Sequence, residues 1–440
     1  DLGKFKRDTV IAEGRKAVFS QTNLTLKYDF PDFATLTSST NFQQTKSNWI
    51  LQAGEIPGIG PLLNLSEPWD TEFFAQEFRL VSNTAGPFSW VAGLFYLDSS
   101  TEDAQVRLVV DGLQDFVEAV AGPGIIDSDD FLTQVTTSKT KELAAYGDLT
   151  WYFTDKWSLS GGLRVFKFDS SYSGTDTYAF DFESFGPVYP PDVFNQADDS
   201  SSTWRTVLSY QATDDKLFYG SISKGYRVGQ VNPNYGPSFV DPEDLFIEEA
   251  YDPDESINYE LGAKTQWLDG RFQVNAALYF IDWTDVQVDA VRPSDRRNYI
   301  ANAGTVHSRG FELELVAVPV DNLDLRWVMS WQDSKIDEIS PENSFLSGAR
   351  VGDTMPGTAD FLTAASARYL WDLSGSWDLE GYLGIQYVGD SPNRFSYGTA
   401  TGLPNPDFAI NESYTNICLL YTSPSPRDLI AHLVCRLLLE

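Results

Sequence analysis

Apolar and polar side chains alternate with a period of two along much of this chain, and short turns join the alternating segments in pairs. The clearest pair occupies residues 259–283, where Leu261 and Trp267 alternate with polar neighbours, Asp269-Gly270 provides a tight turn, and the alternation resumes at Phe272. Each arm is about twelve residues long, roughly twice the usual length of a globular strand. The apolar face of so long a hairpin must pack against another sheet, a helix layer or lipid.

The same pattern recurs along the chain and predicts about fourteen strands. They pair as 23–30 with 33–42, 72–82 with 88–97, 141–153 with 157–168, 204–212 with 217–227, 259–267 with 272–280, 309–318 with 323–332, and 361–370 with 377–388. The turns within pairs are roughly two to six residues long. Every connection between pairs is long, near 44–71, 99–138, 170–202, 228–254, 285–306, 335–358 and 389–409.

This strict alternation of short and long connections indicates a transmembrane antiparallel β-barrel, in which short turns lie on one side of the membrane and long loops on the other. A sandwich or a propeller has no reason to place every long loop at one end. Aromatic residues cluster where strands meet short turns, as expected at a membrane interface. They are Trp151, Phe153, Trp157, Trp267, Phe272, Trp371 and Trp377. The alternative is that these rings form the core of a soluble sandwich.

Composition limits the alternatives. The 440 residues carry a formal net charge of −32, which argues against a nucleic-acid partner because phosphates need Lys and Arg. Much of the acid lies in long connections, since residues 169–203 and 228–263 contain no Lys or Arg. No run of eighteen apolar residues occurs, so no transmembrane helix is expected. The first residues show no signal-peptide pattern, so we expect either a mature start or a fragment.

The last segment differs from the rest. Both cysteines, Cys418 and Cys435, lie in it. Back-translated, "CLLYTSPSPRD" and "LVCRLLLE" resemble the two ends of a transposase-type sequencing adapter. We therefore expect residues 418–440 to be a non-native tail that follows a barrel portion at 1–417. The alternative is a short amphipathic helix or a linker.

Five motifs, in order, resemble the barrel of TonB-dependent outer-membrane receptors. They are "EFRLVSNTAGPFSWVAGLFY", "LFYGSISKGYRVGQVNP", "INYELGAKTQWLDGRFQVNAALYFIDWTDVQV", "ANAG…SRGFELEL" and "ESYTN". The resemblance covers about 20–417 and implies a 22-stranded barrel around an N-terminal plug. This chain would supply about 14–16 of those strands, so we expect a barrel that is incomplete at both ends.

The resemblance also implies a function. Such a protein lies in the outer membrane of a Gram-negative bacterium, contacts its lipid and takes up a scarce solute. The solute is most often a ferric siderophore, and cobalamin or a glycan are the alternatives. The plug of such a protein transmits energy from the TonB complex of the inner membrane, and the protein needs no cofactor. A passive porin-like barrel is one alternative. A secreted β-rich carbohydrate-active enzyme is another.

The sequence offers little material for catalysis. Paired carboxylates such as Asp129-Asp130 and Glu248-Glu249 are adjacent loop residues, whereas a glycosidase needs two held apart around a sugar. His307 and His432 are the only histidines, which leaves little for a triad or a zinc site. The loop "DSDD" at 127–130 offers oxygen ligands for calcium, but a solvated loop is the simpler interpretation. We therefore expect no catalytic residue and no metal ligand.

Charged residues on the polar faces of the strands are the better candidates. We expect a lumen wall that grips the plug, formed by Glu77, Arg79, Arg164, Glu260, Lys264, Glu312 and Glu314. The alternative is a polar wall that faces water. A second group, Lys224, Tyr226 and Arg227, lies where a strand meets a long loop. These residues are candidates for contact with an anionic ligand at the outer mouth, or else rim positions with no ligand role.

Overall fold

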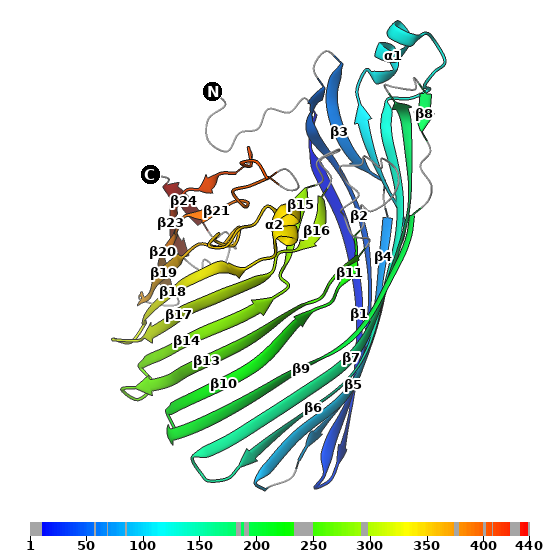
Figure 1. Cartoon of the computed structure of the whole chain (residues 1–440). Coiled ribbons are helices and arrows are strands. Elements are labelled where there is room, and N and C mark those ends of the chain that lie inside the picture. The colour runs from blue at the N-terminus through cyan, green and yellow to red at the C-terminus, as the bar shows by residue number, and fades with distance from the viewer. Residues whose placement is uncertain are drawn as a thin grey trace.

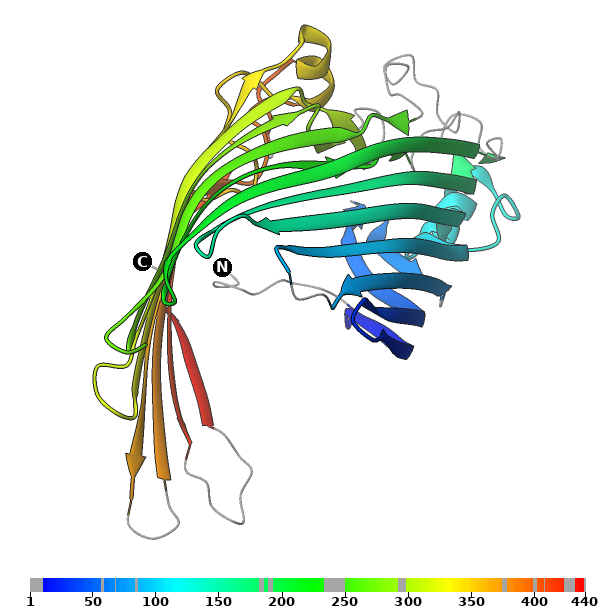
Figure 2. The ribbon, with the colours of Figure 1, turned by 90° about the horizontal axis from the view of Figure 1, so that it is seen from below.

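The structure is a computed structural model and describes residues 11–56, 59–67, 69–83, 86–181, 186–188, 193–232, 250–291, 298–373, 378–398, 402–406, 408–422 and 432–438. Within these residues the chain forms an 18-stranded sheet in which all pairings are antiparallel (Figure 1). Seen from below, the sheet is an open arc, with β1 at one end and β24 at the other (Figure 2).

Sixteen strands follow one another across the arc, and each pairs with the next in the order given. They are β1 (Gly14–Phe30), β2 (Ala34–Ile56), β4 (Trp69–Ser82), β5 (Phe88–Val110), β6 (Asp130–Tyr152), β7 (Trp157–Asp181), β9 (Val193–Thr213), β10 (Lys216–Arg227), β13 (Asp254–Trp267), β14 (Phe272–Thr284), β17 (Thr305–Ala317), β18 (Leu323–Glu338), β19 (Phe361–Asp372), β20 (Asp378–Val388), β23 (Tyr414–Thr422) and β24 (His432–Leu438). β3 (Gly60–Ser66) pairs with β2 and β5, and β8 (Gly186–Val188) pairs with β7.

The short turns line one end of the sheet, here called the turn end, and the remaining elements gather at the opposite loop end (Figure 1). At the loop end lie the small pairs β11 (Gln230–Val231) with β12 (Ala250–Tyr251), β15 (Gln287–Val291) with β16 (Asn298–Asn302), and β21 (Ser391–Pro392) with β22 (Ile410–Asn411), as well as the helices α1 (Leu113–Ala121) and α2 (Pro341–Ser347). In the described part of the chain, neither helix is long and apolar enough to cross a membrane.

The ladder sorts side chains into two faces, because directly paired residues of an antiparallel sheet point to the same side. One row of paired residues crosses the sheet from β7 to β19. It consists of Leu159, Leu208, Gly220, Leu261, Leu278, Phe311, Trp331 and Phe361. Leu261 and Leu278 are 67% and 58% exposed, so this apolar face is open to the surroundings. Charged residues such as Glu260 occupy the other face.

The charged face is the concave one. Tyr146 of β6 donates a hydrogen bond from its hydroxyl to Glu77 Oε1 of β4 at 2.5 Å, across the intervening β5. Side chains two strands apart converge in this way only on the inside of a curved sheet. Glycine makes the approach possible, since a Cβ on Gly93 of β5 would lie 2.4 Å from the Tyr146 ring. Tyr219 lies over Gly262 and Tyr279 over Gly310 in the same manner, each 2.3 Å from where a Cβ would stand.

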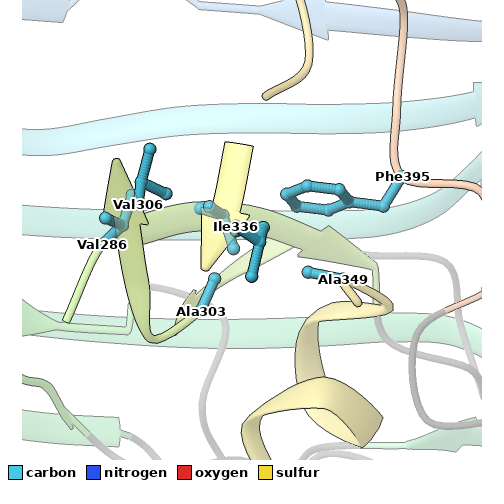
Figure 3. Packing of buried hydrophobic residues seen from close by; sticks show 7 residues of the cluster. Val286, Ala303, Val306, Ile336, Ala349 and Phe395 are labelled. Atoms are coloured by element: carbon cyan, nitrogen blue, oxygen red, sulfur yellow. The ribbon is translucent and has the colours of Figure 1, made fainter. Parts of the chain in front are cut away.

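The two largest clusters of buried apolar residues lie at the loop end. One cluster combines Val286, Ala303, Val306 and Ile336 with Ala349 after α2 and Phe395 (Figure 3). A second cluster lies under α1 and contains Val110, Leu113, Val117 and Ile126. The loop end is therefore a packed structure with small cores of its own.

The expected strand pairs are all present, but the long connections are shorter than predicted. The regions 44–71, 99–138 and 170–202 were expected to be loops, yet β2 reaches Ile56, β5 reaches Val110, β6 starts at Asp130, β7 reaches Asp181 and β9 starts at Val193. Parts of these extensions, such as "SSTEDAQ" in β5, are polar on both faces and so lack the apolar alternation that reveals a half-buried strand. The predicted interface residue Trp377 lies outside the described residues.

The segment expected to be a non-native tail contributes the end of β23 and all of β24. β23 pairs with β20 through Tyr414, Ile417 and Cys418, among others. That residues 418–440 are non-native stays a prediction.

We predict that Gly262→Ala lowers the free energy of unfolding by about 1–3 kcal/mol, because the new methyl group collides with the Tyr219 ring. The temperature at which the sheet unfolds in detergent measures the change. Gly161→Ala is the matched control, since a Cβ there meets no atom within 4 Å. Adding Tyr219→Ala should recover part of the loss, and a Gly262→Ala protein as stable as the control would contradict the packing.

Candidate functional site on the concave wall and the rim

The concave wall contains two hollows that collect most of the predicted wall residues. A hollow of about 580 Å³ over β4–β10 is lined by Glu77, Arg79 and Arg164. A hollow of about 520 Å³ over β10–β20 is lined by Lys264, Glu312 and Glu314. Glu260, the seventh predicted residue, is joined to the second hollow through Tyr219. The sequence pattern thus placed these residues on one face, and the fold brings them into two groups.

Four of the seven residues are held by partners on the wall itself. Glu77 accepts a hydrogen bond from Tyr146, and Glu260 accepts one from Tyr219, both at 2.5 Å. Glu314 accepts from Asn275 Nδ2 at 2.9 Å and from Arg326 Nη2 at 2.5 Å. Arg164 pairs with Glu142. These charges are satisfied without any further molecule.

The other three residues have no such partner. Within the described part of the chain, Arg79, Lys264 and Glu312 form no ion pair within 4 Å, although Lys264 Nζ lies 5.9 Å from the centre of the Tyr219 ring. Their side chains are exposed, whereas those of the four partnered residues are half-buried. Among the seven predicted residues, these three therefore present their charges to the concave space.

The candidate mouth residues at the end of β10 mostly contact other residues of the chain. Lys224 Nζ lies 2.6 Å from Glu255 Oε1, and only 17% of its side chain is exposed. The Tyr226 ring lies 5.3 Å from that of Phe166, and its hydroxyl is buried with no hydrogen-bond partner among the described residues. Contact of these residues with a ligand stays a prediction.

Arg227 is the centre of a polar cluster around one buried carboxylate. Its Nε donates to Asp254 at 2.9 and 3.0 Å, its Nη2 donates to the Gln287 carbonyl at 3.1 Å, and its guanidinium lies 4.9 Å from the centre of the Trp283 ring. The Asp254 side chain is only 2% exposed and also accepts from Gln287 N at 3.0 Å. A buried carboxylate needs such a partner, since an unpaired charge away from water is costly.

Amide side chains extend this cluster across the loop end. Gln287 Nε2 donates to the carbonyls of Val228 and Asp252 at 3.1 and 2.9 Å. Asn302 donates to the carbonyls of Asp252 and Asp285 at 3.1 and 2.6 Å. We call Arg227, Asp254, Gln287 and Asn302 the rim cluster. It ties the ends of β10 and β13 to β15 and β16.

Packing of apolar residues supports the rim cluster. Figure 3 shows Ile336 between Val286 and Val306 on one side and Ala349 and Phe395 on the other. Burial, reinforced by nearby Asp252, Asp254 and Glu255, raises the pKa of the Asp285 carboxyl above its ordinary value. The rim thus combines a small apolar core with several neighbouring acidic side chains.

The sequence did not reveal the rim cluster. Asp254 is the last but one residue of the run "DPEDLFIEEAYDPDE", and nothing in that run separates it from the acids of a solvated loop. Gln287 and Asn302 were within a predicted long connection. Their roles depend on contacts between segments far apart in the chain, which the local pattern does not encode.

The residues considered for metal binding contact the chain itself. Asp129 accepts from the backbone N–H groups of Gly112 and Gln114 at 3.3 and 2.8 Å, and so caps the start of α1. Asp130 pairs with Arg107 at 3.3 Å. In the described segments, no group of three or more His, Cys, Asp or Glu side chains is arranged to hold a metal ion. Glu248-Glu249 lies outside these segments.

Comparison with known proteins accounts for the fold. The sequence profile described as "TonB dependent receptor-like, beta-barrel" matches residues 4–416. The chain belongs to the TonB-dependent receptors. Members of this family are outer-membrane receptors and transporters of Gram-negative bacteria, not enzymes, and they include a siderophore receptor and a metal-pseudopaline receptor.

Individual TonB-dependent receptors are more distant. The pesticin receptor of Yersinia pestis is 26% identical over 261 residues, which cover 58% of this chain and 35% of that protein. The metal-pseudopaline receptor CntO of Pseudomonas aeruginosa is 23% identical over 273 residues, 62% of this chain and 33% of that receptor. The chain spans about a third of the length of these curated relatives.

Solved structures share the architecture. The ferric yersiniabactin uptake receptor FyuA of Yersinia pestis matches with a TM-score of 0.69 at 18% identity, over 93% of this chain and 54% of its own. The siderophore receptor PiuA of Acinetobacter baumannii gives a TM-score of 0.66 at 17% identity, over 93% of this chain and 58% of its own. These likenesses concern the fold.

We predict that Arg227→Ala opens the rim. The variant leaves Asp254 buried without its cation, which costs about 3–5 kcal/mol, so β11, β12, β15 and β16 should exchange amide hydrogens faster. Hydrogen exchange of the detergent-solubilised protein measures this. Arg309→Ala is the control. The Arg309 side chain is 67% exposed, so its ion pair with Asp333 should contribute at most about 1 kcal/mol to stability. Equal exchange in the two variants would argue against a clamped rim.

A second prediction compares the two faces at adjacent positions. Leu278→Arg places a charge on the convex face and should destabilise the membrane-inserted sheet by about 2–4 kcal/mol, if the site lies near mid-bilayer. Ala277→Arg places the same side chain on the concave wall, opposite Glu312, and should cost less. Unfolding in lipid bilayers measures both. Similar losses of stability in both variants would contradict the assignment of one face to lipid and the other to the concave wall.

Proposed function

We propose that this chain is the barrel portion of an outer-membrane receptor that takes up a metal complex, most often a ferric siderophore, with energy from the TonB complex. The observation that carries the proposal is the family match along residues 4–416. Named relatives support the ligand class, because FyuA is a ferric yersiniabactin uptake receptor, FecA a ferric citrate transporter and CntO a metal-pseudopaline receptor. All three handle small metal complexes.

The geometry supports transport through the concave space. The outward apolar face suits outer-membrane lipid, while the wall suits an aqueous lumen that holds the plug of the complete receptor. The rim cluster holds a fixed edge at the loop end, above that lumen. In this proposal Lys224, Tyr226 and Arg227 border the entry for the ligand, and the plug transmits the pull of the TonB complex.

Uptake of radiolabelled iron tests the proposal. Cells that lack their own receptors would express the full receptor that carries this barrel and be offered one ferric siderophore at a time. We expect uptake of at least one chelate, and we expect it to disappear when TonB is deleted. The same cells without the receptor are the control. Uptake that persists without TonB would favour a passive porin-like barrel, and no uptake of any metal complex would contradict the ligand class.

A further inference from the structure

Negative charge is concentrated at the loop end. The seven long connections of the sequence, from 44–71 to 389–409, contain 33 of the 63 acidic residues but only 8 of the 31 basic residues. The rest of the chain is closer to balance, with 30 acidic and 23 basic residues. Each connection joins two strands at their loop ends, so most of the net charge of −32 belongs to the side of the sheet where the concave space opens (Figure 1). We call this opening the mouth.

Most of the cations described at the loop end are already paired with acids. Lys224 Nζ lies 2.6 Å from Glu255 Oε1, and Arg227 donates to the buried Asp254. Further ion pairs join Lys46 to Asp70 at 3.0 Å, Arg107 to Glu67 at 2.9 Å and Lys335 to Asp333 at 2.9 Å. In the described parts of the connections, Arg350 lies over the Tyr397 ring and Arg394 is exposed. The two cations predicted to meet an anionic ligand, Lys224 and Arg227, are thus neutralised within the chain.

Several acids beside the rim cluster are open to solvent instead. Asp252, Asp285 and Asp289 are exposed and form no ion pair in the described part of the chain. The pKa of the Asp285 carboxyl is raised by burial and then by neighbouring acids, so Arg227 does not cancel the negative potential there. Exposed acids without an ion pair among the described residues also surround α1, namely Asp111, Asp115 and Asp127.

Charge of one sign around an opening acts on solutes before they touch the protein. Such a field raises the local concentration and the association rate of an oppositely charged solute by roughly 10–10³-fold, and it repels a solute of the same sign. Screening limits its range to about 8 Å at physiological salt, so the effect is local to the mouth and weakens as salt is added. The acids therefore influence which solutes reach the concave space, without forming a binding site for any one ion.

We propose that the mouth admits cationic and uncharged metal complexes and keeps anionic ones away. This inference rests on the proposed function for the transport of a metal complex, and it narrows the class of ligand. Iron(III) held by three singly charged hydroxamates is uncharged, and a protonated amine on the chelator makes the complex cationic. Iron(III) held by three doubly charged catecholates is a trianion. The first two classes suit the mouth, and the third does not.

Three chromium(III) chelates of similar size and different charge test the field directly. They are the tricationic tris(ethylenediamine), the uncharged tris(acetylacetonate) and the trianionic tris(oxalate) complexes. Each relaxes a nitroxide spin label by collision, so power saturation of the label measures the local concentration of each chelate. The label is attached to Val351→Cys, a 65% exposed position close to Ala349 of the packed rim, in the full receptor with its other cysteines replaced. No transport, TonB protein or natural chelate is needed, so failure here is distinct from failure of uptake.

The trication should collide with the label several-fold more often than the trianion at low salt, and the uncharged chelate should fall between them. The difference should nearly vanish in about 1 M salt, where the screening length is about 3 Å. Equal collision rates of the trication and the trianion at low salt, or a higher rate for the trianion, would overturn the proposal.

Two triple variants locate the charge that matters. Asp252→Asn, Asp285→Asn and Asp289→Asn together remove three acids of the rim and should lower the ratio of trication to trianion collisions at least about two-fold. Asp155→Asn, Asp214→Asn and Asp215→Asn remove three exposed acids at the turn end and should leave the ratio unchanged. A rim variant that behaves like the turn-end control would also overturn the proposal, because the acids of the rim would then not set access to the mouth.

Discussion

In hydrocarbon, a backbone N–H or C=O group without a partner costs several kcal/mol, and water is not there to replace the partner. The antiparallel ladder meets this constraint for the strands that lie between β1 and β24, and the two faces of the sheet depend on it. The ladder sets which side chains meet lipid and which meet the lumen. It also explains why the described sheet curves, since only closure of a sheet on itself removes its edges.

The loop end is stabilised by different contacts from those of the membrane-spanning strands. There, polar extensions, a small apolar core and the rim cluster replace the simple alternation of the strands. Asp254 is buried beside a partly exposed Arg227, so the pair depends on its surroundings as much as on its own attraction. These contacts fix the edge of the loop end beside β10 and β13.

The sequence predicted the strand pairs, the faces and the position of the wall charges because a period of two is visible wherever one face is apolar and the other polar. Leu261 and Glu260 are adjacent, and the pattern assigns them to opposite faces of the sheet for that reason. The prediction failed where the signal vanishes, as in residues 98–105 of β5, which are polar on both faces. It also could not distinguish Glu77 from Arg79, since the tyrosine that satisfies Glu77 comes from a strand 69 residues away.

The tyrosines that lie over glycines have a consequence for assembly. Tyr146 meets Glu77 only after β4, β5 and β6 stand in the correct register, and the ring then covers Gly93. A slip by one residue would turn the phenol into the hydrocarbon and leave a gap over the glycine. Tyr219 over Gly262 and Tyr279 over Gly310 impose the same penalty on later strands. Each pair therefore makes a strand that pairs one residue out of register less stable than the correctly paired strand.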